Sequence, residues 1–105
     1  MAKIRVIIKE PGKGAYEAYI NNTLEDLQKT VDGYIETFTF ALDAAIICDE
    51  EGKLKDKPYN FTMFGQDFVG TIIIAGVHDD SFCDFAPTAE EISKIFSWKE
   101  KPNGK

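Results

Sequence analysis

The sequence predicts an α+β fold, in which a mostly antiparallel sheet includes an N-terminal β-hairpin, one short helix after the hairpin and one C-terminal helix. Two segments with alternating apolar and polar residues, 4–9 and 16–20, lie on either side of a run of turn residues. Only two segments, 22–31 and 87–96, have the helical spacing of apolar residues. Strand-like segments dominate between them and do not alternate regularly with helices, which favours two-layer packing with the helices on one side of the sheet.

The N-terminal hairpin and the helix after it have clear local signals. Alternation of apolar and polar side chains in the first two segments is typical of half-buried strands, and the intervening Glu10–Gly14 is rich in turn residues. In the helix that follows, we expect Asn22 or Thr23 to cap the first turn. We expect Gly33 to end this helix, because glycine adopts the left-handed conformation at little cost.

The central part of the chain is expected to supply most of the sheet. Segments 34–40 and 44–48 predict two strands, and residues 49–54 predict a tight turn into a short returning strand. Segment 55–60 is expected to be a loop. The most apolar stretch, 68–77, contains three consecutive Ile residues and predicts one central strand that is buried on both faces.

The last part of the domain predicts a connector followed by a helix. Residues 81–86 form the expected connector, with two Phe side chains as anchors. Thr88, followed three residues later by Glu91, is a capping box that predicts the start of the helix. We expect Trp98, beyond the helix, to cover an edge of the core.

The composition is that of a single globular domain, because the chain has 105 residues of which 44% are hydrophobic and 29% charged. We expect residues 1–100 to form this domain and residues 101–105 to be a flexible tail. No apolar run approaches the ~20 residues of a membrane helix, and the first residues lack the apolar core of a signal peptide. We therefore expect a cytoplasmic protein without membrane contact, in which Cys48 and Cys83 are reduced.

The charge is unevenly distributed along the chain. The net charge is −6, and residues 15–52 contain one Lys against nine Asp and Glu residues. Such a surface attracts a basic protein partner, and the two clusters expected to take part are Asp49-Glu50-Glu51 and Asp79-Asp80. We do not expect direct nucleic-acid binding, which requires a basic face. The alternative is an ordinary solvated acidic surface.

Three tyrosines are further candidates for binding. Tyr16, Tyr19 and Tyr34 lie in or next to the predicted strands, and Tyr side chains suit contacts that are half exposed to water. They could contact a partner or hold a small nucleotide. The alternative is that they lie at the edge of the core.

The densest group of chemically capable side chains surrounds the single histidine of the chain. His78, Asp79, Asp80, Cys83 and Asp84 fall within seven residues. The carboxylates suit a hard cation, and Cys83 with His78 could form a nucleophile and base. A polar turn between the last central strand and the last helix is the simpler interpretation. We therefore predict no catalytic residues, no metal site and no cofactor.

The order of several segments resembles domain-of-unknown-function family 3846. The resemblance covers roughly residues 3–96, and its most specific parts lie in Thr23–Glu36 and Ile46–Leu54, with support from Asp67–Gly76. Members of this family are small proteins, mostly from Gram-positive bacteria, their phages and integrative elements. The resemblance implies a mobile-element setting and supplies no catalytic motif.

The sequence thus predicts a non-catalytic binding protein of phage or mobile-element origin, such as a counter-defence inhibitor that uses its acidic surface on a protein partner. One alternative is a sponge-like oligomer that holds a small nucleotide, and another is an accessory domain of a bacterial enzyme. We expect a monomer or a homodimer, since an open strand edge left by the hairpin could pair with a second chain.

Overall fold

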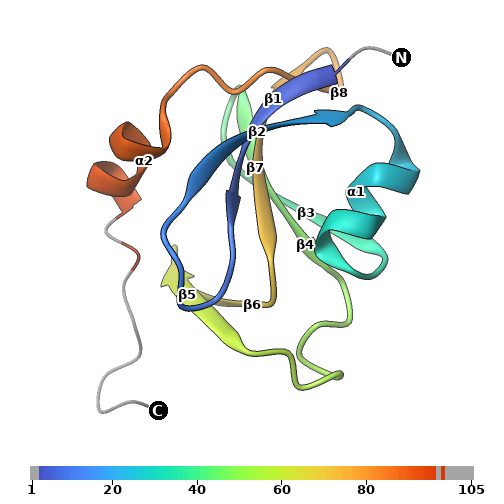
Figure 1. Cartoon of the computed structure of the whole chain (residues 1–105), viewed down its shortest axis with the longest axis vertical. Coiled ribbons are helices and arrows are strands. Elements are labelled where there is room, and N and C mark those ends of the chain that lie inside the picture. The colour runs from blue at the N-terminus through green and yellow to red at the C-terminus, as the bar shows by residue number, and fades with distance from the viewer. Residues whose placement is uncertain (1–2, 97, 99–105) are drawn as a thin grey trace.

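The computed structural model describes residues 3–96 and 98 (Figure 1). Two helices and eight strands follow one another in the order β1 (Lys3–Lys9), β2 (Tyr16–Asn21), α1 (Leu24–Val31), β3 (Ile35–Ala41), β4 (Ala44–Asp49), β5 (Tyr59–Met63), β6 (Gln66–Val69), β7 (Ile72–His78), β8 (Ser81–Cys83) and α2 (Ala89–Phe96). The predicted tail at 101–105 lies outside the described residues. In the part of the chain that is described, no helix has the length and apolar character needed to cross a membrane.

The main sheet has the strand order β2-β1-β7-β4-β3, and β8 pairs with β7. All of its strand pairs are antiparallel, including the N-terminal hairpin of β1 and β2. β7 lies at the centre, where Ile74 is paired with Ile7 of β1 and with Ile46 of β4. The α+β class, the antiparallel sheet and the N-terminal hairpin are therefore confirmed.

Both faces of the sheet are apolar and both are covered. On one face, Leu27 and Val31 of α1 pack with residues such as Ile47 and Ile73. On the other face, α2 and the separate β5–β6 hairpin cover a cluster that includes Ile46 and Ile74. The helices therefore lie on opposite faces (Figure 1), and the expectation that they share one side is wrong. The physical reason is that neighbouring residues of β4 and β7 are both apolar, so each face must be shielded from water.

The central segments differ from the prediction at two places. The predicted strand over 68–77 is two strands, because Gly70 has a left-handed φ of 71° and its N–H donates to the Pro58 carbonyl at 2.7 Å. Residues 50–56 form successive turns and not a returning strand. The strand that returns is β5, which pairs with β6, and the predicted connector after β7 contains the short strand β8.

The helix starts follow the sequence signals. The Thr23 hydroxyl accepts a hydrogen bond from the Asp26 amide at 3.2 Å, so Thr23 is the N-cap of α1. At α2, the Thr88 amide donates to Glu91 Oε1 at 2.8 Å and the Glu91 amide donates to Thr88 Oγ1 at 3.1 Å, which confirms the capping box.

Trp98, which follows α2, packs against the aromatic side chains of the core. The Trp98 ring centroid lies 4.9 Å from that of Phe61 and 5.2 Å from that of Phe96. Trp98 therefore covers an edge of the cluster beneath α2, as the sequence predicts.

Two polar contacts fasten distant segments to β1. The buried Lys9 donates through Nζ to Asn60 Oδ1 at 3.0 Å, and Asn60 Nδ2 donates back to the Lys9 carbonyl at 2.8 Å. At the other end of β1, Arg5 Nη1 donates to the carbonyls of Phe85, Ala86 and Pro87. The first contact fixes the β5–β6 hairpin and the second fixes the segment that leads into α2.

Candidate binding surface

A groove of about 380 Å³ lies between α1 and the turns that follow β4. Tyr34 and Glu51, two of the residues singled out from the sequence, lie in its lining together with Glu25 of α1. Tyr34 is 66% exposed, so its ring is available for contact. The remaining lining residues are Gln28, Lys29, Gly33 and Lys55.

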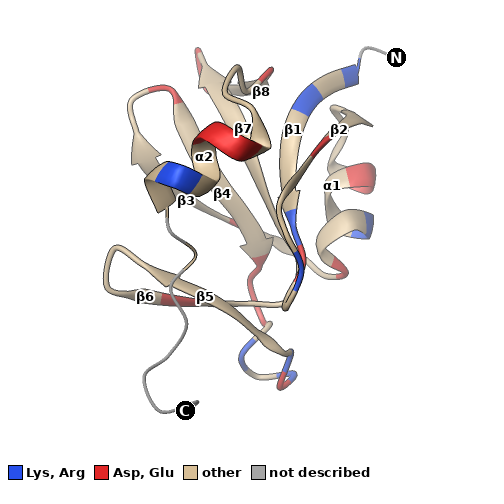
Figure 2. Ribbon diagram, turned by 60° about the vertical axis from the view of Figure 1, so that its left-hand side comes forward, with Lys and Arg blue, Asp and Glu red and all other residues tan. Residues whose placement is uncertain are grey.

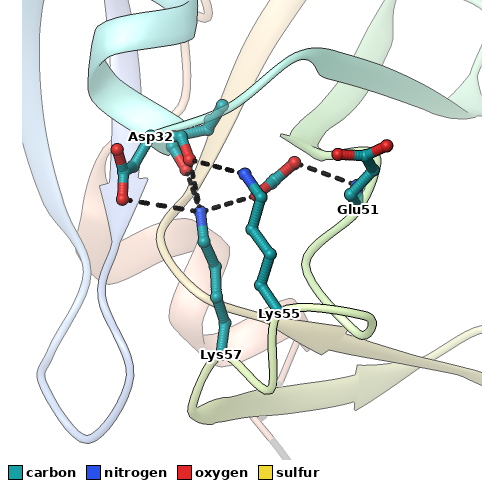
Figure 3. A network of polar contacts seen from close by, with 6 residues as sticks. Asp32, Glu51, Lys55 and Lys57 are labelled. Carbon is teal, nitrogen blue, oxygen red and sulfur yellow. Dashed lines mark hydrogen bonds and ion pairs between the residues drawn. The ribbon is translucent and has the colours of Figure 1, made fainter.

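Glu51 and Lys55 of this groove both contact a buried carboxylate, and Figure 3 labels these two partners together with Lys57. The Asp49 side chain is 1% exposed and accepts hydrogen bonds from Lys57 Nζ at 2.7 Å, Lys55 Nζ at 2.9 Å and the Glu51 amide at 2.9 Å. Burial opposes ionisation of Asp49, but the hydrogen bonds from Lys57, the Glu51 amide and Lys55 outweigh it and hold the pKa at about 2. Asp49 is therefore part of the interior, which corrects its expected place on the acidic surface.

The same lysines satisfy the C-terminal end of α1. Lys57 Nζ donates to the carbonyls of Val31 and Asp32 at 2.8 and 2.7 Å. These carbonyls carry the negative end of the helix dipole, so a lysine there is favourable. The arrangement connects α1, Asp49 and the segment after β4 into one rigid base for the groove.

The end of α1 also differs from the prediction. Asp32, and not Gly33, adopts the left-handed conformation, with φ of 59°. Gly33 is required for a different reason, because a Cβ atom on it would lie 2.4 Å from Cγ of Asp49. Sequence reasoning missed this role, since nothing local indicates that an aspartate sixteen positions later approaches this backbone.

Four exposed carboxylates line either the groove or a smaller depression next to it. Glu36 and Glu50 line a smaller depression of about 170 Å³ that shares the segment after β4 with the groove. We call Glu25, Glu36, Glu50 and Glu51, together with Tyr34, the acidic surface. Figure 2 shows acidic segments on α1 and directly after β4. Within the described residues, none of these four carboxylates forms an ion pair.

One further acidic residue of the 15–52 segment has a structural role elsewhere. Glu17 Oε2 accepts a hydrogen bond from the Ala89 amide at 2.6 Å and lies 3.8 Å from Arg5 Nη2. The hydrogen bond from the Ala89 amide is the main reason that the pKa of Glu17 is lowered. Glu17 thus stabilises the start of α2, and the acid-rich segment does not act as one surface.

The second predicted acidic cluster lies at the other end of the sheet. Asp79 and Asp80 form the turn between β7 and β8, with left-handed φ values of 50° and 64°. β4 and β7 are antiparallel, with Ala44 opposite Gly76, so the ends of these strands point in opposite directions. Asp79 and Asp80 are therefore separate from Glu50 and Glu51.

The tyrosines are not gathered into one site. Tyr16 and Tyr19 are three residues apart on β2 and so point to opposite faces of that strand. The Tyr16 hydroxyl donates to Glu10 Oε2 at 3.0 Å. Only Tyr34 of the three contributes to the groove beside α1.

The residues around His78 are divided among different contacts. His78 and Cys83 share a depression of about 470 Å³ with Asp84 and Asp43. Asp84 Oδ1, however, accepts a hydrogen bond from the Arg5 amide at 2.8 Å, and Asp80 lines another depression beside the start of α1. Among the described residues, no group of three or more His, Cys, Asp and Glu has the arrangement of a metal site.

The other cysteine is enclosed in the core. Cys48 belongs to the cluster beneath α2. Burial is the main cause that raises the pKa of its thiol to about 11, and the neighbouring carboxylates Glu36 and Asp49 add to the effect. A thiol in this state is a poor nucleophile at neutral pH.

Comparison with known proteins gives one result. The model of the family described as Domain of unknown function (DUF3846) matches residues 4–97. No curated protein and no solved structure matches the chain.

Proposed function

We propose that this chain, which belongs to the DUF3846 family, is a non-catalytic binding protein whose acidic surface contacts a basic surface of a protein partner. The observation that supports this function is the set of four exposed carboxylates around Tyr34, none of which forms an ion pair within the described residues. Unpaired surface charges of one sign attract an oppositely charged partner and raise its association rate.

The rigid base of the groove supports the same proposal. Lys55 and Lys57 are both bound to the Asp49 carboxylate, so they do not neutralise the glutamates above them to the extent that free lysines would. An exposed Tyr among charged residues is typical of an interface, because its ring supplies apolar area and its hydroxyl a hydrogen bond.

The same contacts favour a protein partner over a nucleotide. A phosphate in the groove would need a free cation. Of the two lysines in the lining, Lys55 already pairs with Asp49 at 2.9 Å, which leaves Lys29 alone to meet the phosphate. The C-terminal end of α1, with its negative partial charge, also points to this region. A nucleotide-holding role therefore has less support from the geometry.

The finer proposal is an inhibitor that covers a host or phage protein, in keeping with the mobile-element setting that the family resemblance implies. Steric cover of a basic functional surface needs no catalytic group in the inhibitor. The acidic surface would supply the electrostatic attraction, and Tyr34 would supply the apolar contact.

Two double variants test the acidic surface, and each removes two negative charges. Glu50→Gln with Glu51→Gln alters the surface, whereas Asp79→Asn with Asp80→Asn alters the opposite end of the sheet and keeps residues that tolerate a left-handed backbone. In affinity capture from host lysate at low and high salt, we expect a salt-sensitive partner that the first variant loses and the control retains. Equal capture by both variants would contradict the proposal.

A further inference from the structure

β3 forms an edge of the main sheet with an open side. It pairs with β4 alone among the described strands. The Glu50 amide donates to the Tyr34 carbonyl at 2.8 Å, on the side of β4. Backbone groups alternate in direction along a strand, so those of Ile35, Thr37 and Thr39 are directed outward, away from β4.

This edge has only part of the usual protection against pairing. Natural sheets shield their edges with charged side chains, above all Lys, with Pro, with very short strands or with bulges. β3 has seven residues, of which Glu36 alone is charged, and it contains neither Lys nor Pro. A register shift interrupts its pairing with β4 only after Thr39, so the three outward-directed residues lie before the irregularity.

Apolar side chains border the edge on the face beneath α2. Phe38 and Phe40 are partly buried there, and each stacks on Phe64 with ring centroids 5.7 Å apart. Phe64 is 53% exposed and has a left-handed φ of 57°, a conformation that is unfavourable for a bulky residue. Leu42, at the tip of the β3–β4 hairpin, is fully exposed. A strand added to β3 would therefore find apolar contacts on this face.

The charges around β3 indicate the chemistry of the added strand. Glu36 and Glu50 lie at one end of β3 and Asp43 follows its other end, and all three are exposed. A second copy of this chain would bring the same carboxylates and the same net charge of −6. A segment with Lys or Arg at its ends would instead meet opposite charges.

We infer that β3 receives an extended segment of a protein partner as an additional strand, with basic residues at the ends of that segment and alternating apolar residues between them. The inference rests on the proposed function, since Glu36 and Glu50 belong to the acidic surface. Backbone hydrogen bonds to Ile35, Thr37 and Thr39 supply the attachment, as in other cases of strand addition. The partner's side chains supply the selectivity.

The probe that tests the inference is a synthetic eight-residue peptide with two Lys at each end and alternating Val and Thr between them. A matched peptide carries N-methyl groups on the backbone nitrogens that would donate to β3. In a titration followed by amide NMR of the full chain, we expect the largest shifts at Ile35, Thr37 and Thr39. The methylated peptide should bind at least about tenfold more weakly, because it has lost several main-chain hydrogen bonds.

Variants of the edge give a second readout. Thr37→Pro removes one outward N–H but no donor to β4, whereas Thr37→Val keeps that N–H. We expect the first to weaken peptide binding about tenfold and the second to change it less than twofold. If the Pro variant does not fold, the methylated peptide still decides the question.

Three outcomes would overturn the inference. Equal binding of the two peptides would show that main-chain pairing is not used. Shifts confined to α1 and the groove would place the segment elsewhere, and dimerisation of the chain through β3 would make a second copy the occupant. Failure of the proposed function is separate, because it would appear as unchanged partner capture by the Glu50→Gln, Glu51→Gln variant.

Discussion

Asp49 is buried, although aspartate is usually found on protein surfaces. Its carboxylate has two lysine partners and one backbone partner, which offset the cost of removing the charge from water. The sequence alone does not indicate that Asp49 is buried while the adjacent acidic residues, Glu50 and Glu51, are exposed. The difference between them comes from position, because Asp49 is the last residue of the buried strand β4.

The ionisation of Asp49 predicts how the protein responds to acid. Its pKa in the folded state is about 2, below the ordinary value of 3.8, so its contribution to stability is present above about pH 4 and is lost as the pH falls toward 2. This contribution is roughly 2 kcal/mol. Urea unfolding between pH 5 and pH 2 should show this loss in the wild-type chain.

The Asp49→Asn variant is the control for the acid response. At neutral pH it should be less stable by about 2–4 kcal/mol, because Lys57 loses its buried carboxylate partner, and its stability should depend less on pH in the acid range. Glu50→Gln, at the exposed neighbour, should stay within about 0.5 kcal/mol of the wild type. An acid response that Asp49→Asn leaves unchanged would contradict the role given to this carboxylate.

At the scale of the element, the end of α1 is set by a close approach between two backbone segments. Gly33→Ala would place a Cβ atom 2.4 Å from the Asp49 carboxyl, which must then move away from its lysines. We expect a loss of about 1–3 kcal/mol in thermal or urea unfolding. Gly14→Ala is the matched control, because a Cβ atom there has no neighbour within 4 Å. A loss of stability as large at Gly14 as at Gly33 would argue against this cause.

Elements with strong local signals were predictable, and contacts between distant elements were not. The capping residues Thr23 and Thr88 and the alternation in β1 and β2 act within a few residues, so the sequence displays them directly. The split at Gly70 depends on a hydrogen bond to Pro58. The burial of Asp49 depends on Lys57 and Gly33. Such partners are fixed only when the whole chain is folded.

Only part of the candidate surface was predictable from the sequence. The acid-rich segment and Tyr34 were visible in the sequence, and the structure brings Tyr34, Glu51 and Glu25 into one groove. The sequence could not show that Glu17 stabilises the start of α2 or that Asp79 and Asp80 lie at the other end of the sheet.

At the scale of the whole molecule, the sheet separates two apolar clusters. Leu27 of α1 packs on one face and Ile92 of α2 on the other, and both are 3% exposed. Replacing either with Ala should cost about 2–4 kcal/mol. The two losses should add within about 0.5 kcal/mol in the double variant, because sites without shared contacts are independent. A larger coupling energy in urea unfolding would contradict two separately packed faces.

The attachment of Arg5 to residues 85–87 has a consequence for the order of events during synthesis. β1 leaves the ribosome before the other described strands, but the carbonyls that receive its Arg5 side chain are about eighty positions later. Its partner β7 also follows late in the sequence. Until those residues emerge, β1 has only β2 beside it, and a lone hairpin is marginally stable in water. The native sheet therefore closes only after β7 and the segment at 85–87 have emerged, and a nascent chain that stops before residue 72 lacks its central strand.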